Sequence, residues 1–344
     1  MDRVSIVIPA RNEERFLPEC LQSVQAQTYP HNLLEIILID SDSSDGTREI
    51  MEEFAAASDI AVRVFDHPRG DTPGALNIGF RNAVGEFVFH LIAHVSIEPD
   101  HIERAIRKLH EMDADAICGR IITTGSGEAS FWDNGISAAM ASILGIGNAT
   151  ARVSAKPQWL DNPMQAIYKR ELFDKFGYLD ERLTRNQDYE FHQRCHAGGA
   201  RFWFEPELKI FYRSRRTLAQ LWRQYFNAAK WRTFMIGSYR GAVKARHLVT
   251  PVFFLSLLAS GIAAILWQPA LVAFAAILGA YCIAIIVGTI WAIVRRKSAS
   301  ILIALPVALA TIHFAFALGF IAGFFHFIIF GKRKRVAIAE KQTH

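Results

Sequence analysis

Apolar runs alternate with amphipathic stretches along the first third of the chain. The apolar, β-branched runs predict buried strands at 4–8, 35–40, 62–65 and 87–91. The stretches with apolar residues at helical spacing predict helices at 13–27, 44–57, 74–83 and 99–112. Strands that alternate with helices pair in parallel, because each crossover helix returns the chain to the end of the sheet at which the previous strand began. The pattern therefore predicts an α/β fold in which helices cover both faces of a mostly parallel sheet.

A different pattern begins after Arg246, where charged residues almost disappear until Phe330. Residues 249–266 and 270–294 are each about long enough to cross a hydrocarbon core of roughly 30 Å at 1.5 Å per helical residue. Buried helices of a soluble protein would carry charges on a polar face. We therefore predict two membrane crossings here, and a C-terminal region of transmembrane helices.

The third apolar segment, 301–330, is long for one crossing and short for two, with Pro306, His313 and Gly319 as candidate breaks. Clusters of Lys and Arg favour the cytoplasmic side of a membrane, and they lie at 240–246, 295–297 and 332–335. A hairpin over 249–294 keeps the first two clusters on one side. The third joins them only if 301–330 turns back as a shorter or re-entrant hairpin, and we predict this return. A single tilted span would leave the third cluster outside.

A basic amphipathic helix is predicted just before the membrane segments. Its apolar residues recur at helical spacing, and Arg223, Asn227 and Lys230 lie on its other faces. The apolar set is Leu218, Leu221, Trp222, Tyr225, Phe226 and Ala229. Such a helix lies in the lipid interface or packs against the preceding domain, and both can hold. The predicted organisation is a cytosolic α/β domain (1–215), an interfacial helix or linker (216–247), transmembrane helices (248–335) and a polar tail (336–344).

Composition narrows the class of partner. The formal net charge is +5 over 344 residues, but the basic residues cluster beside the membrane segments and no nucleic-acid motif is present, so anionic lipid is favoured over nucleic acid. The four cysteines are scattered and form no CxxC pair, which predicts neither a disulfide framework nor a zinc site. The apolar run at the start is too short for a signal peptide, so we expect the first domain in the cytosol.

Ligands on a parallel sheet bind beyond the carboxyl ends of its strands, which here are 9–13, 40–46 and 90–95. Asp40 ends a buried strand and can accept hydrogen bonds from the imide or ribose of a nucleotide, whereas Asp45 is better explained as a helix cap. Asn77 and Arg81 either reach a diphosphate or belong to a solvated helix face. Asp188 precedes a helical stretch, where it is either a functional carboxylate or a charge favoured by the helix dipole.

Four motifs together resemble the family 2 glycosyltransferases with the Rossmann-like GT-A fold, over about residues 2–235. They are Val4 to Glu13, Ile39 to Thr47, Ala75 to Gly79 with Ala83 to Gly85, and Asn186 to Asp188. Further motifs resemble the bacterial exopolysaccharide glucosyltransferases of the succinoglycan ExoA type. These are Gly145 to Ala149, Phe176 to Asp180, Tyr212 to Arg216, and Gln224-Tyr225 with Lys230 to Arg232.

The resemblance implies an inverting transfer, in which an acceptor hydroxyl attacks the anomeric carbon of a nucleotide sugar opposite the departing diphosphate. It implies that Asp188 is the general base, which the chemistry supports because such a base must be ionised at neutral pH. Gln187, which stands where the family usually has glutamate, joins Gln224 and Trp231 on the acceptor side. The implied donor-binding residues are Pro9, Ala10, Arg11, Glu13, Asp40, Asn77, Arg81, Ala93, Arg213 and Arg216.

Relatives hold a divalent cation through an Asp-x-Asp or Asp-Ala-His triplet, and here the triplet is Ile92-Ala93-His94. A hydrocarbon cannot ligate a metal, so one interpretation is a weaker ion on His94, the phosphate oxygens and water, with Mn²⁺ favoured over Mg²⁺. The other is that Arg213, Arg215 and Arg216 replace the ion.

The resemblance predicts a membrane-bound enzyme that moves a hexose, with UDP-glucose as the first candidate donor, to a lipid-linked saccharide at the cytoplasmic face of the bacterial plasma membrane. Processive relatives carry Gln-x-x-Arg-Trp, and Gln224 to Asn227 breaks that pattern, so a single addition is expected. Two alternatives stay open. The acceptor could be polyprenyl phosphate itself, or the Ile92 and Gln187 departures could mark a nucleotide-binding membrane subunit without catalysis.

Overall fold

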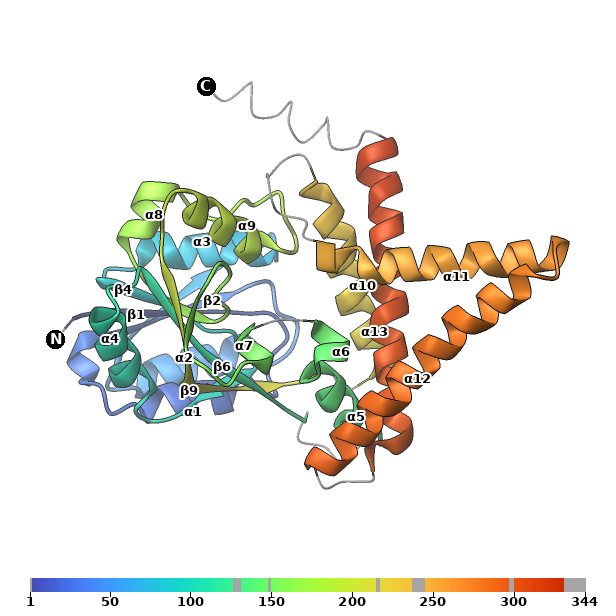
Figure 1. Cartoon of the computed structure of the whole chain (residues 1–344). Helices are drawn as coiled ribbons and strands as arrows, with labels where there is room; N and C mark the ends of the chain where they lie inside the picture. Colours follow the sequence, from blue (N-terminus) through green and yellow to red (C-terminus); the bar gives the residue numbers. More distant parts are fainter. Residues whose placement is uncertain are drawn as a thin grey trace. The chain divides into compact units, whose positions relative to one another are not determined.

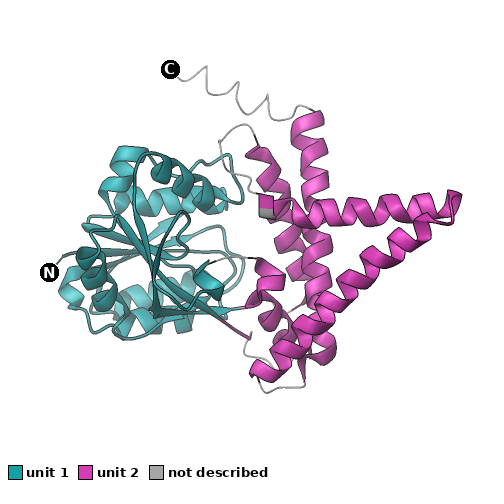
Figure 2. Ribbon diagram, in the orientation of Figure 1, with its two compact units in different colours: residues 1–122, 150–213 teal, residues 123–149, 214–344 magenta. Residues whose placement is uncertain are grey.

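The structure is a computed structural model that describes residues 2–125, 131–147, 150–214, 217–236, 245–296 and 300–330. The chain divides into two compact units (Figure 2). The first contains residues up to 122 together with 150–213, and the second contains 123–149 and everything from 214 onward. The two units are described separately below.

The first unit is built on a mixed sheet, whose described strands run in the order β3-β2-β1-β4-β8-β6-β9-β5, with β7 beside β9. The strands are β1 (Val4–Ala10), β2 (Leu34–Asp40), β3 (Ala61–Asp66), β4 (Phe87–His90), β5 (Val95–Ile97), β6 (Ala116–Thr124), β7 (Gln158–Leu160), β8 (Ala166–Lys169) and β9 (Phe202–Arg213). Strands β1 to β4 are parallel, and β8 runs antiparallel to β4 and β6. The four predicted strands are confirmed as the parallel half of the sheet.

Helices cover both faces of this sheet, as predicted. They are α1 (Leu17–Gln25), α2 (Thr47–Ala57), α3 (Thr72–Asn82), α4 (His101–Glu111), α7 (Thr150–Val153), α8 (Glu171–Phe176) and α9 (Gln187–Ala197), with a 3₁₀ turn η1 at His31–Leu33. Helices α1, α2 and α4 lie on one side, and α3, α8 and α9 lie on the other (Figure 1). Strands β1 and β2 are buried along their whole length apart from Pro9, which is why their sequences are continuous apolar runs.

The second unit is helical within its described residues. Its elements are α5 (Phe131–Met140), α6 (Ile143–Ile146), α10 (Leu218–Phe234), η2 (Ala245–His247), α11 (Val249–Leu266), α12 (Ala270–Arg296), α13 (Ile301–Gly323) and the π-helical turn η3 (Phe324–Ile329). The predicted amphipathic helix is confirmed as α10, and the first two apolar segments are confirmed as α11 and α12. By length and composition, three helices could cross a membrane: 249–266, 270–296 and 301–329.

The prediction that 301–330 turns back on itself is wrong. Helix α13 runs from Ile301 to Gly323 and continues directly into η3, with mean hydropathy 2.3 over its most apolar window. Pro306 lies inside the helix without ending it. The glycine expected to break the segment instead permits close packing, because a Cβ added at Gly319 would overlap the backbone of Phe226 in α10. Cluster 332–335, on which the predicted return depended, lies outside the described residues.

The boundary after residue 215 also differs from the structure. Residues 123–149 leave the first unit and group with the C-terminal helices, although they lie far from them in sequence. Helix α5 explains this grouping, since a Cβ added at Gly135 would overlap the backbone of Ala304 in α13, so the two helices touch at the main chain. A segment whose contacts are this close folds with its partner helix rather than with its neighbours in sequence.

Candidate functional site

The loops after β1 and β2 hold each other in place. Asn12 and Asp42 both adopt the left-handed conformation, with φ of 56° and 60°. The side-chain oxygen of Asn12 accepts a hydrogen bond of 2.8 Å from the Ser44 amide, and the Glu13 amide donates one of 2.8 Å to the Thr47 hydroxyl at the start of α2. Two adjacent strand ends are thereby fixed as one rim at the carboxyl edge of the sheet.

Asp40 lies at the bottom of this rim with one carboxylate oxygen unused. The side chain is 9% exposed, its Oδ2 is 3.5 Å from the Ser43 amide, and its Oδ1 is buried without a hydrogen-bond partner among the described residues. A buried acceptor without a partner costs about 1–3 kcal/mol, so its usual explanation is a ligand or a water. Arg11 stands at the same rim, where it donates to the Gly70 carbonyl at 3.1 Å and lies 3.7 Å from Asp42.

His94 is held by Glu13. Its Nδ1 lies 2.9 Å from Glu13 Oε1, and this contact leaves Nε2 as the ring nitrogen available to a ligand. A metal-binding histidine is commonly held in this way. Within the described residues no three His, Cys, Asp or Glu side chains gather to hold a metal, and Ile92 adds no ligand. His94 is the candidate protein ligand that remains here, and its metal role stays a prediction.

Asn77 and Arg81, on α3, contact the segment after α8. The Asn77 amide donates to the Leu179 carbonyl and to Glu181 Oε1, and its oxygen accepts from the Leu179 amide, all at 2.9 Å. Arg81 lies over the Tyr178 ring, 4.9 Å from its centroid. Asn77 therefore anchors this segment to α3, and donor contact by either residue stays a prediction.

The remaining predicted donor residues differ in surroundings. Pro9 and Ala10 form the end of β1, and Ala93 is buried in the turn after β4. Arg213 makes a two-pronged ion pair with Glu19 on α1 at 2.8 Å, so its guanidinium is tied to α1 at the end of β9. Arg215 and Arg216 lie outside the described residues, and the cationic replacement of the metal stays a prediction.

The three predicted acceptor residues lie in different units. Gln187 is the first residue of α9 in the first unit, is 8% exposed, and has an Oε1 with no partner among the described residues. Gln224 and Trp231 lie on α10 in the second unit, where the Trp231 ring packs 5.2 Å from Phe327. Their acceptor roles stay predictions.

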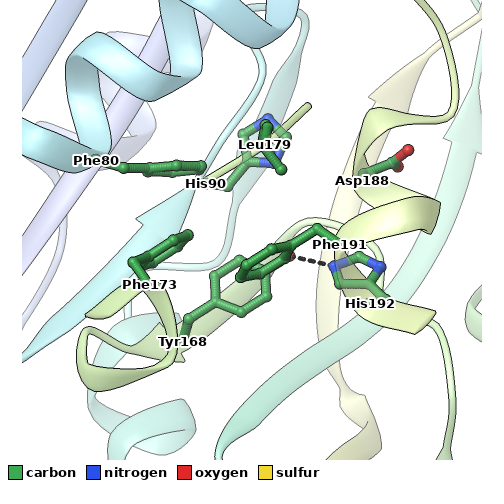
Figure 3. Close-up of a pocket in the computed structure, with 8 residues that line it drawn as sticks. All are labelled: Phe80, His90, Tyr168, Phe173, Leu179, Asp188, Phe191 and His192. Atoms are coloured by element: carbon green, nitrogen blue, oxygen red, sulfur yellow. Dashed lines mark hydrogen bonds between the residues drawn. The ribbon is translucent and has the colours of Figure 1, made fainter. Parts of the chain in front are cut away.

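Asp188, the predicted base, lines a small pocket in the first unit. It is the second residue of α9, is half-buried, and accepts a hydrogen bond of 2.8 Å from the Tyr189 amide. The pocket has a volume of about 10 Å³, enough for roughly one water. Figure 3 shows its lining: Phe80, His90, Tyr168, Phe173, Leu179, Asp188, Phe191 and His192. The lining is largely aromatic, so a charge there is poorly screened.

The two histidines that line the pocket, His90 and His192, are neutral at physiological pH. Burial lowers the pKa of His90 to about 4 and that of His192 to about 4, while the nearby Asp188 charge raises the pKa of each against that trend. Burial also raises the pKa of Tyr168 well above its ordinary value, so its hydroxyl keeps its proton. That hydroxyl donates to His192 Nε2 at 2.8 Å (Figure 3). His192 Nδ1 in turn donates to Asn162 at 2.8 Å.

Sequence reasoning identified Asp188 but not the polar groups around it. His90 was noted only as the end of a strand, and Tyr168, His192 and Asn162 were not singled out. His90 left a readable signal, since it is the one polar residue in the run Phe87 to Leu91. Tyr168 and Asn162 left none, because they come from parts of the chain with no motif. His192 lies four residues after Asp188 on α9, a helical spacing that sequence reasoning did not use.

Comparison with known proteins gives a consistent picture. Residues 5–177, half of the chain, match the family described as Glycosyl transferase family 2. Succinoglycan biosynthesis protein ExoA of Rhizobium meliloti (strain 1021) is 27% identical over 260 residues, 74% of this chain and 77% of that protein. The predicted resemblance to the family, and to the ExoA type within it, is confirmed.

Two further matches extend over nearly the whole chain. One is the dolichyl N-acetyl-alpha-D-glucosaminyl phosphate 3-beta-D-2,3-diacetamido-2,3-dideoxy-beta-D-glucuronosyltransferase of Methanococcus voltae. It is 23% identical over 333 residues, 94% of this chain and 97% of that protein. The other is the structure of mannosyltransferase PcManGT from Pyrobaculum calidifontis in complex with GDP-Man and Mn²⁺. It superposes with a TM-score of 0.61 at 20% identity, over 94% of this chain and 88% of that one, which shows a shared GT-A-like fold.

Proposed function

Because the chain belongs to glycosyl transferase family 2, we propose that it is a membrane-bound inverting glycosyltransferase that adds one hexose from a UDP-sugar, with UDP-glucose as the first candidate, to a lipid-linked saccharide. The observation that carries the proposal is Asp188, a half-buried carboxylate in an aromatic pocket on the first residues of α9. The pocket also contains His90, the last residue of β4, so the carboxylate faces the edge of the sheet where ligands bind.

In the proposed reaction Asp188 accepts the proton of the acceptor hydroxyl. The hydroxyl oxygen forms a bond to the anomeric carbon of the sugar, and the bond from that carbon to the β-phosphate oxygen breaks on the opposite face. The nucleoside diphosphate leaves with the electron pair, so the anomeric configuration inverts. A positioned base of this kind contributes about 10²- to 10⁴-fold to the rate.

The donor is proposed to lie along the rim formed by the β1 and β2 ends. The unpartnered Oδ1 of Asp40 accepts from the base or ribose, and Arg11 faces the phosphates. His94 would hold a divalent ion through Nε2, with Mn²⁺ favoured over Mg²⁺ because the ligand is an imidazole. Such an ion, when bound, neutralises charge on the departing diphosphate.

A membrane location with the first unit on the cytoplasmic face accounts for the acceptor. The three helices that could cross a membrane belong to the same chain, and ExoA and the Methanococcus voltae enzyme bear names that place them in polysaccharide or lipid-linked glycan synthesis. Anionic lipid is the proposed partner of the basic residues beside these helices.

The test uses full-length protein in lipid nanodiscs with radiolabelled UDP- and GDP-sugars, and with lipid-linked saccharides extracted from bacterial membranes. We expect wild-type protein to label the lipid fraction with one donor, and Asp188→Asn to lower the rate about 10²- to 10⁴-fold while UDP binds as before in calorimetry. Equal loss of transfer and UDP binding would refute the base assignment. A labelled phosphodiester-linked monosaccharide would reassign the acceptor to polyprenyl phosphate, and UDP binding without transfer under any divalent ion would leave a subunit without catalysis.

A further inference from the structure

His90 is a buried, uncharged histidine that the proposed reaction does not yet use. It is 8% exposed, it ends β4, and its ring stands edge-on to Phe80 at 6.3 Å between centroids. Its Nε2 is fully buried and has no hydrogen-bond partner among the described residues. An unsatisfied buried donor is costly, so a group of this kind normally has a partner that arrives as water or ligand.

The pocket supplies both the room and the partner. Its volume of about 10 Å³ corresponds to one water, and Asp188 is the only carboxylate among the described residues that line it. Burial lowers the pKa of His90 to about 4, and the Asp188 charge acts on the ring in the opposite direction. The two side chains are therefore electrostatic neighbours, although 98 positions separate them in sequence.

The other titratable groups of the pocket are already committed. Tyr168 donates to His192, and His192 donates to Asn162, so this chain of hydrogen bonds uses both nitrogens of His192 and the hydroxyl proton of Tyr168. Four of the described lining residues are hydrocarbon: Phe80, Phe173, Leu179 and Phe191. A water in the pocket thus finds one donor in His90 and one acceptor in Asp188.

We propose that His90 is a positioning residue for Asp188: its imidazole, protonated on Nε2, donates through a single water in this pocket to the Asp188 carboxylate. This inference rests on the proposed function, in which Asp188 is the base. The hydrogen bond holds the carboxylate in one orientation toward the acceptor hydroxyl. It also stabilises the ionised form, which is the form that accepts a proton.

The test compares His90→Phe and His90→Gln with a matched control, His101→Phe. His101, the first residue of α4, is also a buried histidine and is 2% exposed. Its ring stacks on Phe89 of β4, and it is not among the residues that line the pocket. Phenylalanine fills the space of the ring without a donor, and glutamine restores an N–H at similar reach. Donor KM, kcat and the pH profile of kcat are measured in nanodiscs with the donor that wild-type protein uses, and folding is checked by UDP binding.

We expect His90→Phe to lower kcat about tenfold to hundredfold, the range for loss of one hydrogen bond to a charged group, with little change in donor KM. The acid limb of its pH profile should move to higher pH, because a carboxylate that loses a donor is more easily protonated. His90→Gln should recover most of the loss, and His101→Phe should keep kcat within about twofold of wild type.

Three results would overturn the inference: wild-type kcat and pH profile in His90→Phe, equal losses in His90→Phe and His101→Phe, or no recovery in His90→Gln. Adding His90→Phe to Asp188→Asn should cost nothing further, because the positioned group is already gone, and an additive loss would also count against it. Failure of the proposed function gives a different outcome, namely no transfer by wild type, or transfer retained in Asp188→Asn.

Discussion

Gly319→Ala should push α13 away from α10, whereas Gly279→Ala, the same change in α12, should not. A Cβ added at Gly319 would lie closer than 3.0 Å to the Phe226 backbone, a distance that real Cβ atoms essentially never show. Nothing lies within 4 Å of a Cβ added at Gly279. Both variants replace a helical glycine by alanine. A second helix lies close to the new methyl group in Gly319→Ala but not in Gly279→Ala.

The magnitudes follow from these surroundings. Each substitution gains about 1 kcal/mol of helix propensity. The obstruction at Gly319 is main chain, which cannot rotate aside as a side chain can, and overpacking of this kind costs about 1–3 kcal/mol. Moving α13 away by about 0.5–1 Å also forfeits a quarter to a half of the dispersion energy of each contact along the interface. We expect Gly279→Ala to be neutral or stabilising, and Gly319→Ala to destabilise the helical unit by roughly 2 kcal/mol.

The assay is thermal unfolding of the full-length protein in one detergent. Trp231 on α10 is a convenient reporter, because its ring lies 5.2 Å from Phe327 in η3, which continues α13. Its fluorescence and near-ultraviolet circular dichroism should change in Gly319→Ala and stay as in wild type in Gly279→Ala. Equal shifts of the unfolding temperature in both variants, with an unchanged Trp231 signal, would refute the packing of α13 on α10.

Three further predictions concern the first unit. Ile92→Asp should raise activity with Mg²⁺ relative to Mn²⁺ in a metal titration, because it restores a carboxylate ligand, and an unchanged or lower rate would show that the reaction does not need that ligand. Asn77→Leu, which removes three hydrogen bonds, should lower the free energy of unfolding by about 2–4 kcal/mol in denaturant titration, whereas an unchanged midpoint would show that the loop after α8 is not anchored there. Burial holds the pKa values of His90, His101 and His192 near 4, so between about pH 6.5 and pH 4 the unfolded chain binds more protons than the folded one. Stability should therefore fall as pH falls through that window, and a flat pH dependence of the unfolding midpoint would contradict the buried neutral state.

The parallel half of the sheet was predictable because its strands are buried on both faces. Strands β1 and β2 are continuous apolar runs, and such runs need no partner to be recognised. The other half was not predicted. Strand β9 alternates between buried and half-exposed positions, and β5, β7 and β8 have only three or four residues each, too short for a period to show.

The three apolar helices that could cross a membrane show the same division. Length and hydropathy predicted α11 and α12 to within two residues at their ends. Most of each helix is exposed, so its apolar composition can be recognised without knowing which other helices it contacts. For α13 the same reasoning failed. About 44% of its most apolar window is buried inside the protein, and its glycines Gly319 and Gly323 allow close contact with α10 rather than a turn.

The sequence by itself determined the family, the α/β pattern and the apolar helices, and it singled out Asp188 as the predicted base, because motifs and periodicity are local properties of the chain. Only the tertiary structure decided what surrounds that carboxylate. Antiparallel pairing of β4 with β8, which sets Phe89 opposite Ile167, brings His90 and Tyr168 to one pocket with α9. Contacts of this kind depend on strand order and register, which arise from the packing of the whole sheet and leave no mark at any one position.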